Sequence, residues 1–399
     1  MPELLDGIKE RDFGRCPSLS LYIHIPFCIK KCSYCDFFSR PLGGTEAFIE
    51  RIIEELKYFL GLISPDSVPT VFIGGGNPPL MGLGALQKLC ESINAILPNR
   101  PREWTIESNP AQISPEFCRM IGESGVNRLS VGVQTLRDDQ LSLLGRTGSR
   151  EMTLHALDII SSNWTGKLNV DMLSGIPGQK IGTAETDVLE VLHFEPGHVS
   201  LYELTVEDNT DLQESIDSGR ISALDHTLSA RIYTAQRKIL ETNGYSRYEI
   251  SNYALPGKES LHNLGYWQMN PYLGIGPSAG STLPGNDGPV RLSARASLPD
   301  WNYKAERIGP EDFLFEHIMM GMRLAEGLER NRIKKIFGYP PDEYYPETAG
   351  RWNYRKFLSF HGKYFTLING GIEYLNAFLR DILGEVPDKP INPVPDWGG

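Results

Sequence analysis

The sequence predicts an α/β protein, a partial and open TIM-like (β/α)6 barrel followed by a smaller C-terminal α+β domain of winged-helix-like type. The alternation of elements predicts the barrel, because six short apolar runs are separated by amphipathic helical stretches in the first half of the chain. Polar residues or glycines also recur where these runs end. Barrels of this kind build their sites at the C-terminal rim of the strands.

Length and charge limit the classes of function. The chain has 399 residues and a formal net charge of −11, which gives no support to nucleic-acid binding or to a polybasic membrane surface. No apolar run reaches membrane-spanning length, and residues 1–18 do not resemble a secretory signal. We therefore expect a cytoplasmic protein without a transmembrane segment, while a transient association with a membrane stays open.

The chain divides into five expected parts. They are an N-terminal extension at 1–18, the partial barrel at 19–210, a barrel-closing segment at 211–300, the C-terminal domain at 301–383 and a Pro-rich tail, expected to be disordered, at 384–399.

The expected strands are short apolar runs with a candidate site residue behind each of them. The runs are Leu19–Ile25, Thr70–Ile73, Trp104–Glu107, Arg128–Val133, Leu168–Leu173 and His198–Leu204. The candidates at their ends are a cysteine-rich loop, Gly74–Gly76, Glu107, Gln134, Asp171 and Glu203. Because parallel strands end at one rim, we expect these residues to ring one cavity, with Glu107 and Asp171 near Cys28.

Helices are expected between the strands from apolar residues at helical spacing. Residues 45–60 show such a stripe with Thr45 as the cap, and Leu83–Leu97 shows another. Ser114 is expected to cap a third helix that Gly125 ends.

The second half of the chain is less regular. Residues 211–244 are expected to be helical, and the aromatic and polar segments at 245–253, 262–267 and 272–280 are expected to be loops that line a site. We expect a surface loop at 284–299, an apolar helix at 311–324 and a hairpin at 365–374.

Cys28, Cys32 and Cys35 stand at C-x3-C-x2-C spacing directly after the first expected strand. Three thiolates can hold three irons of a [4Fe-4S] cluster and leave the fourth iron open for another ligand. A structural zinc site usually needs four ligands in two pairs, and the remaining cysteines are isolated in the sequence. Six cysteines in 399 residues are also too few for a disulfide framework.

The other candidates each have a structural alternative. Gly74–Gly76 is either a turn or a place where backbone approaches a ligand closely. Glu107 is either a solvated carboxylate or a pair of acceptors for ribose hydroxyls. Arg146 and Asp171 suit a zwitterionic ligand or a propionate, but alone they are ambiguous, as is Gln134.

Several motifs together resemble the HemN/HemW branch of the radical S-adenosylmethionine (SAM) superfamily, from about residue 19 to residue 383. They lie at 22–28, 35–37, 125–134, 144–146, 171–179, 248–253 and 262–267. The resemblance implies a partial barrel, a [4Fe-4S] cluster on the three cysteines, SAM on its open iron and an electron donor for the cluster.

The resemblance also implies the residues that contact ligands. Tyr22, Gly75 and Glu107 are expected to contact the cluster-bound SAM. Positions that hold a second SAM in relatives correspond here to Tyr34, Gly76, Asn77, Gln134, Arg146 and Asp171. Two departures weaken that second site, because Asn77 replaces a threonine and Gly148 replaces a histidine of the family pattern.

Within the branch, two features favour a haem chaperone over a decarboxylating enzyme. Phe37 stands where the oxidases carry a further cysteine, and the His262–Trp267 motif is intact. The resemblance then implies haem as cargo, haem-acceptor proteins as partners and His262 as the haem ligand, although a histidine among aromatic residues is also commonly structural. Oxygen-independent oxidation of coproporphyrinogen III and another radical reaction, such as methylation, are the alternatives.

Overall fold

Six parallel strands form the centre of the structure, a computed structural model that describes residues 5–392. They are β2 (Ser20–Ile25), β3 (Thr70–Gly75), β4 (Glu103–Ser108), β5 (Arg128–Gln134), β6 (Lys167–Ser174) and β7 (His198–Glu203). Each strand pairs in parallel with the next one along the chain. The predicted strands are confirmed, and so is the open α/β architecture, since β2 and β7 do not pair with each other.

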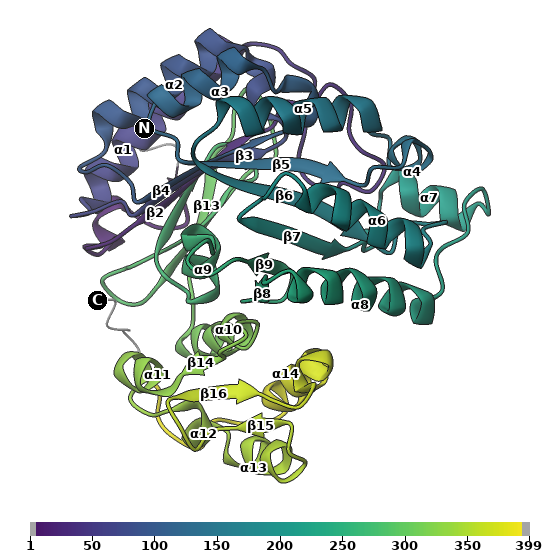
Figure 1. Cartoon of the computed structure of the whole chain (residues 1–399). Coiled ribbons are helices and arrows are strands. Elements are labelled where there is room, and N and C mark those ends of the chain that lie inside the picture. The colour runs from purple at the N-terminus through teal and green to yellow at the C-terminus, as the bar shows by residue number, and fades with distance from the viewer. Residues whose placement is uncertain (1–4, 393–399) are drawn as a thin grey trace.

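Helices cover the outer face of this sheet (Figure 1). They are α1 (Thr45–Ile63), α2 (Leu83–Ile96), α3 (Pro115–Glu123), α5 (Arg150–Asn163), α6 (Ile181–Leu192) and α8 (His226–Thr242), while α4 (Asp138–Leu143) and α7 (Asp211–Asp217) lie beyond the ends of the strands. Short 3-10 turns lie at Glu10–Asp12, Pro78–Met81, Pro110–Gln112 and Gly371–Tyr374. None of the helices between residues 5 and 392 has the length and apolar character that crossing a membrane requires.

Two expected helix ends have different outcomes. Ser114 caps α3 as predicted, because its side chain accepts a hydrogen bond from Phe117 N at 3.1 Å. The predicted Thr45 cap is wrong: Thr45 is the first helical residue, and Gly44 precedes it with a φ of 62°, a left-handed conformation that suits glycine.

The main core lies between the sheet and these helices. Strand residues that face the helices, such as Val71, Ile106 and Val131, are fully buried and apolar. Because side chains alternate across a strand, the residues between them face the inside of the partial barrel, and many of these are polar. These inward-facing polar residues can therefore form a binding site inside the barrel.

The sheet continues beyond the six strands on both sides. On the β2 side the order is β10 (Tyr272–Ile275), β11 (Gly280–Leu283), β12 (Val290–Ala294), β13 (Tyr303–Arg307) and β1 (Leu5–Asp6). On the β7 side it is β9 (Asn252–Ala254) and then β8 (Ser246–Arg247). The surface loop predicted at 284–299 is therefore wrong, since β12 pairs there with β11 and β13.

The chain then forms a small C-terminal unit with its own apolar core (Figure 1). Its elements are α10 (Pro310–Gly321), β14 (Leu328–Glu329), α11 (Arg330–Phe337), α12 (Pro341–Tyr344), α13 (Pro346–Tyr354), β15 (Leu358–Ser359), β16 (Tyr364–Leu367) and α14 (Leu375–Leu383). The order of helices and strands, with β16 between β14 and β15, is that of a winged helix and confirms the predicted type. The predicted 365–374 hairpin is wrong, because β16 pairs with strands that precede it.

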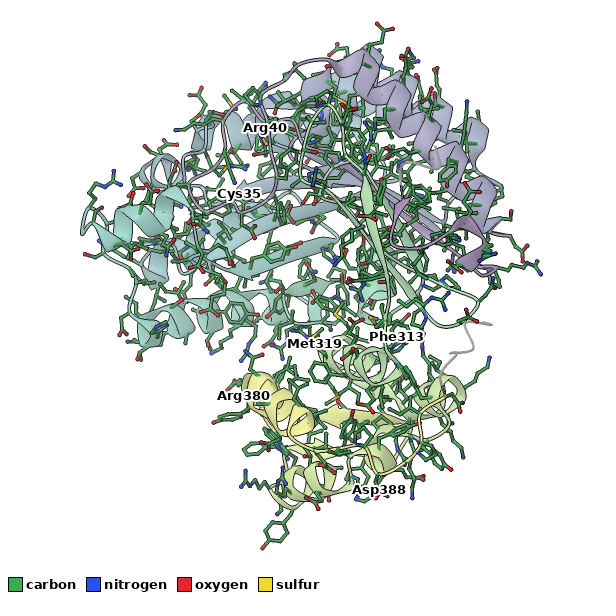
Figure 2. The ribbon with its side chains drawn as sticks, turned by 180° about the vertical axis from the view of Figure 1, so that it is seen from behind. Cys35, Arg40, Phe313, Met319, Arg380 and Asp388 are labelled. Atoms are coloured by element: carbon green, nitrogen blue, oxygen red, sulfur yellow. The ribbon has the colours of Figure 1, made fainter. Side chains whose placement is uncertain are left out.

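The boundaries of the two units follow from their contacts. β13 belongs to the large sheet although it lies beyond the expected boundary at residue 301, and the second core begins with α10. In Figure 2, Phe313 and Met319 of α10 lie at the junction, with Arg380 and Asp388 in the small unit. Asp388 N donates to Tyr344 O at 2.9 Å, so this part of the expected tail packs on the small unit. Residues 1–4 of the expected extension and 393–399 of the tail lie outside the described residues.

Candidate functional site

The cysteine-bearing loop joins β2 to α1 and is held at both ends. At its neck, Cys28 N donates to Arg40 O at 2.9 Å, and Arg40 N donates to Pro26 O at 2.7 Å. At its far end, Ser33 N donates to Leu144 O at 2.9 Å. Cys35 and Arg40 mark the loop in Figure 2, at the ends of the parallel strands of the large unit.

Cys28, Cys32 and Cys35 are half-buried free thiols that line one cavity. Burial raises the pKa of Cys28 to about 11, with a further contribution from the other two cysteines, and burial also raises the pKa of Cys35. Burial therefore favours the protonated thiols of Cys28 and Cys35, and a bound cation would hold these two side chains as thiolates.

The surroundings of the cysteines fit a cluster better than a single metal ion. No group of three His, Cys, Asp or Glu side chains within residues 5–392 could hold one ion, whereas the thiols of a cubane each serve a separate iron. A Cβ added at Gly76 would lie 3.0 Å from Cys28 Sγ and 2.6 Å from Phe27 O. Glycine is therefore required for the strand end to approach the cysteine loop so closely. The three-thiol donor set suits a [4Fe-4S] cluster with one open iron.

Most of the predicted ligand contacts line this same cavity. They are Tyr34, Gly75, Gly76, Asn77, Glu107, Gln134, Arg146 and Asp171. The structure thus brings together the loop after β2, the ends of β3, β4 and β5, the loop after α4 and Asp171 from within β6, so these residues share one cavity as expected.

Tyr22 lies behind the cavity wall instead of lining it. Its hydroxyl bonds to His24 Nδ1 at 2.9 Å, and His24 Nε2 bonds to Phe38 O in the cysteine loop at 3.1 Å. A Cβ at Gly75 would meet the His24 ring at 2.5 Å. Tyr22 and His24 thus support the glycine run and the loop from below, a role for His24 that the sequence reading missed.

Glu107 is turned toward the glycine run. Its Oε2 accepts a hydrogen bond from Gly75 N at 2.9 Å, and a Cβ at Gly74 would lie 2.4 Å from the same oxygen. Burial, together with the nearby Asp171 carboxylate, raises the pKa of Glu107 to about 7. Glu107 can therefore exchange a proton near neutral pH.

Arg146 crosses the cavity from the loop after α4. Its Nη2 donates to Asn109 Oδ1 at 3.0 Å and to Gly132 O at 2.5 Å, while Nη1 lies 3.9 Å from Cys32 Sγ. The guanidinium thus joins the cysteine loop to two strand ends. At one of these ends, Gln134 takes a φ of 69° where the β5–β6 register shifts.

Asn77 is held by residues that the sequence reading did not select. Its Nδ2 donates to Gln112 Oε1 at 2.6 Å, and its Oδ1 accepts from Asn109 N at 3.3 Å. Asn109 and Gln112 follow Glu107 in a polar stretch directly behind β4, and that position behind a strand was the signal available for finding them.

Asp171 lies where this cavity meets a second one inside the barrel. It accepts hydrogen bonds from Ser130 Oγ at 3.0 Å and from Asn169 Nδ2 at 2.8 Å. Burial raises its pKa, and these bonds and Arg146 oppose the increase. The second cavity is lined in part by Phe72, Thr105, Ser130, Asn169, His198, Ser200 and Tyr202. Glu203, predicted at the rim, also lines the second cavity and accepts from Ser229 Oγ at 3.1 Å.

The opposite end of the barrel is closed by α9 (Leu261–Trp267), which lies between the strands and α10 (Figure 1). Glu103 Oε1 accepts from Ser260 Oγ at 3.2 Å and from His262 N at 3.1 Å. The Glu103 carboxylate also pairs with Arg128 at 3.4 Å and Lys167 at 3.7 Å. We call this set of contacts around Glu103 the barrel floor.

His262 belongs to the barrel floor and lines neither of these two cavities. It is 2% exposed, and its ring packs against Phe72 and Tyr266, with centroids 5.1 and 4.8 Å away. Its Nδ1 bonds to Thr70 Oγ1 at 2.8 Å, and its Nε2 has no hydrogen-bond partner among residues 5–392. Burial lowers its pKa to about 3. This burial and packing are those expected of a structural histidine, and ligation of haem iron by His262 stays a prediction.

Comparisons with known proteins identify the family of the chain. The model of the radical SAM superfamily matches residues 22–190. "Heme chaperone HemW" of Lactococcus lactis is 30% identical over 92% of this chain and 98% of its own length. "Heme chaperone HemW" of Escherichia coli is 30% identical over 93% of this chain and 100% of its own length.

A solved structure shares the fold. The coproporphyrinogen III oxidase HemN from Escherichia coli, described as a radical SAM enzyme, superposes with a TM-score of 0.76 at 18% identity. The match covers 92% of this chain and 90% of that one, so the similarity extends through the small C-terminal unit.

Proposed function

Because the chain belongs to the HemN/HemW branch of the radical SAM superfamily, we propose that it is a [4Fe-4S]- and SAM-binding haem chaperone that delivers haem to acceptor haemoproteins. The observation that carries this proposal is the similarity to chaperones of that name along almost the whole chain. The proposal includes an electron donor for the cluster and haem-acceptor proteins as partners.

In this proposal Cys28, Cys32 and Cys35 would hold the cluster, and the glycine run with Glu107 would contact SAM. When bound, the cluster would provide one-electron chemistry for cleavage of SAM. Glu107 accepts a hydrogen bond from Gly75 N, and its raised pKa of about 7 allows it to hold or release a proton near neutral pH. Tyr22 acts through His24 by holding the loop.

The remaining cavity residues provide groups of both charges. The Arg146 guanidinium suits a carboxylate, and the Asp171 carboxylate suits an ammonium group. Together with Tyr34, Gly76, Asn77 and Gln134 they are proposed to hold a second zwitterion of the SAM type. The amide of Asn77 is already bonded to Gln112, so this residue contributes chiefly to the wall of the site.

An anaerobic haem titration of the cluster-reconstituted protein, followed in the Soret band, tests the chaperone role. We expect saturable binding of about one haem per chain and transfer to an apo-acceptor. If the loaded protein gives no haem to any apo-acceptor, the proposal fails.

The same titration decides the role of His262. His262→Ala and Thr70→Val disturb the same contact in the barrel floor, but the alanine variant alone removes a potential iron ligand. Weaker binding and a changed Soret band in His262→Ala alone would support ligation. Equal binding by both variants would assign His262 to the floor.

One observation favours a second candidate, an oxygen-independent coproporphyrinogen III oxidase. The second cavity shares Glu107, Gln134 and Asp171 with the first, which offers room for a substrate beside SAM. Formation of 5'-deoxyadenosine and protoporphyrinogen from coproporphyrinogen under reducing, anaerobic conditions would establish this enzyme and overturn the chaperone proposal.

A further inference from the structure

Two motifs singled out in the sequence, at 248–253 and 262–267, do not line the cavity that holds the cysteines. They lie at the other end of the barrel, around the floor. A chain of hydrogen bonds nevertheless joins this region to Asp171, which lines both cavities. We call it the lumen relay; its members are Ser260, Tyr248, His198, Asn169 and Asp171.

Each step of the lumen relay is within hydrogen-bonding distance. Tyr248 OH accepts from Ser260 N at 3.4 Å and lies 2.8 Å from His198 Nε2. His198 Nδ1 lies 2.5 Å from Asn169 Oδ1, and Asn169 Nδ2 lies 2.8 Å from Asp171 Oδ1. Ser130 strengthens the last step, since it accepts from Asn169 Nδ2 at 2.6 Å and donates to Asp171 Oδ2 at 3.0 Å.

One arrangement of protons satisfies the whole relay. An ionised Asp171 accepts hydrogen bonds only, so the amide of Asn169 must turn its NH2 toward the carboxylate. Its oxygen then faces His198, which must carry its proton on Nδ1. The lone pair of Nε2 is left to accept the Tyr248 hydroxyl, which is free to donate because it accepts from Ser260 N.

Burial makes this arrangement costly to disturb. Asn169 and His198 are 5% and 2% exposed, so their polar atoms depend mainly on partners within the protein, and loss of one partner costs free energy. Burial and the nearby Arg128 and Lys167 lower the pKa of His198 well below its ordinary value. The imidazole is therefore neutral, as the relay requires, and burial also raises the pKa of the Tyr248 phenol.

We propose that His198 and Asn169 are positioning residues that hold the Asp171 carboxylate toward the ligand cavity, and that the floor motifs act on SAM binding through them. Asn169 fixes the direction of the carboxylate, His198 fixes the orientation of Asn169, and Tyr248 fixes the ring of His198. This inference rests on the proposed binding of SAM at Asp171.

The test is SAM affinity, measured by anaerobic equilibrium dialysis of the cluster-reconstituted full chain. Hydrogen-bond partners that orient metal ligands typically contribute about 10- to 100-fold in affinity, and by the same reasoning His198→Leu should weaken SAM binding by about 10-fold or more. Tyr248→Phe should have a smaller effect in the same direction, since it removes only the outermost step. Unchanged affinity in both variants overturns the inference.

Two variants of His198 separate its contacts. Asparagine places an amide N–H near the position of Nδ1 and can keep the bond to Asn169, whereas glutamine reaches the position of Nε2 and keeps the bond to Tyr248. We expect His198→Asn to retain SAM affinity and His198→Gln to lose it. The reverse order would contradict the proposal, because it would show that the Asn169 contact is dispensable.

Thr105→Val is the matched control. Thr105 lines the same cavity as His198, and its hydroxyl has no partner in the described part of the chain. Its replacement should leave SAM affinity unchanged, and a loss equal to that of His198→Leu would point to a general disturbance of the barrel. Melting temperature and iron content of each variant show whether the fold and cluster persist.

A double-mutant cycle with Asp171→Asn supplies the readout that a purely structural role would not give. If His198 acts through Asp171, then His198→Leu should cost little further affinity once Asp171 has been replaced. If the losses in SAM-binding free energy from His198→Leu and Asp171→Asn simply add in the double variant, the inference is overturned and the proposed function is unaffected. Absence of SAM binding in the wild type would overturn both.

Discussion

The rim and the floor of the barrel are built from the ends of the same six strands, yet they treat polar side chains differently. At the rim, Glu107 and Asp171 have raised pKa values and face a cavity. At the floor, the fully buried Glu103 is surrounded by Arg128, Lys167 and two donors from the segment that carries α9. The carboxyl groups at the rim can therefore contact a bound ligand, whereas the Glu103 carboxylate at the floor has its charge and hydrogen-bond partners within the protein.

This difference shows why one end of a parallel barrel binds ligands and the other end stabilises it. A buried charge without a partner costs free energy until a ligand of opposite charge binds to it. Removal of one member of a buried ion pair also costs free energy, because the other charge is left without a partner. Substitutions of the rim ligands should therefore weaken binding without destabilising the protein, and substitutions in the ion pairs of Glu103 should destabilise it without weakening binding. The following predictions test that contrast, from the largest effect to the smallest.

Replacing Cys28, Cys32 or Cys35 by alanine should abolish the cluster, so that iron falls from about four per chain to near zero after reconstitution. Iron analysis and the visible absorbance of the cluster measure this. Cys90→Ala is the control, because Cys90 is fully buried in the main core and should keep its iron at some cost in stability. Retention of a full cluster in all three rim variants would contradict the ligand assignment.

Glu103→Gln should destabilise the protein by about 3 kcal/mol, because removing one partner of a buried ion pair leaves Arg128 without its charge partner. Urea unfolding measures this change. Glu306→Gln breaks the exposed pair with Lys304 and should have no measurable effect. Iron content should stay normal in both variants. A Glu103→Gln protein that lost its iron but kept its free energy of unfolding would contradict the separate roles of the rim and the floor.

Glu107→Gln should stabilise the cluster-free protein above pH 7 while weakening SAM binding. The pKa of Glu107 is raised from an ordinary 4.5 to about 7, so the folded state binds the proton more tightly than the unfolded state does. Wild-type stability should therefore fall as pH rises from about 4.5 to about 7, by about 3 kcal/mol at most, and then stay level.

Urea unfolding of both proteins from pH 4.5 to pH 8 checks this window. The stabilities should be closest near pH 4.5 and differ most above pH 7, since glutamine has no proton to lose. A difference that does not change with pH would show that ionisation of Glu107 is not the cause.

Two threonines on adjacent strands give the smallest contrast. Thr70 donates to Ser20 Oγ at 2.9 Å and bonds to His262 Nδ1 at 2.8 Å, whereas the Thr105 hydroxyl lacks a partner within residues 5–392. Thr70→Val should cost about 1–2 kcal/mol, and Thr105→Val should be neutral or slightly stabilising. Chemical unfolding distinguishes them, and equal costs would mean that the bonds of Thr70 contribute nothing.

Much of the fold followed from local pattern. Apolar runs of four to seven residues before glycine or polar residues predicted the central strands, because two-sided burial requires such runs in a parallel sheet. The strands from 272 to 307 were missed, since they are short and lie between glycines and prolines, where the local signal favours loops. Their pairing with β2 and with one another decides their structure.

By itself, the sequence determined the cysteine spacing, the order of parallel units and the residues expected at the strand ends, because spacing and alternation are local properties. Only the tertiary structure decided that Tyr22 lies behind the cavity, that His262 is buried in the floor and that Asn169 and His198 join the floor to Asp171. These outcomes depend on which side chains meet across strands far apart in the chain. The periodicity of a single segment carries no information about contacts between side chains of distant segments.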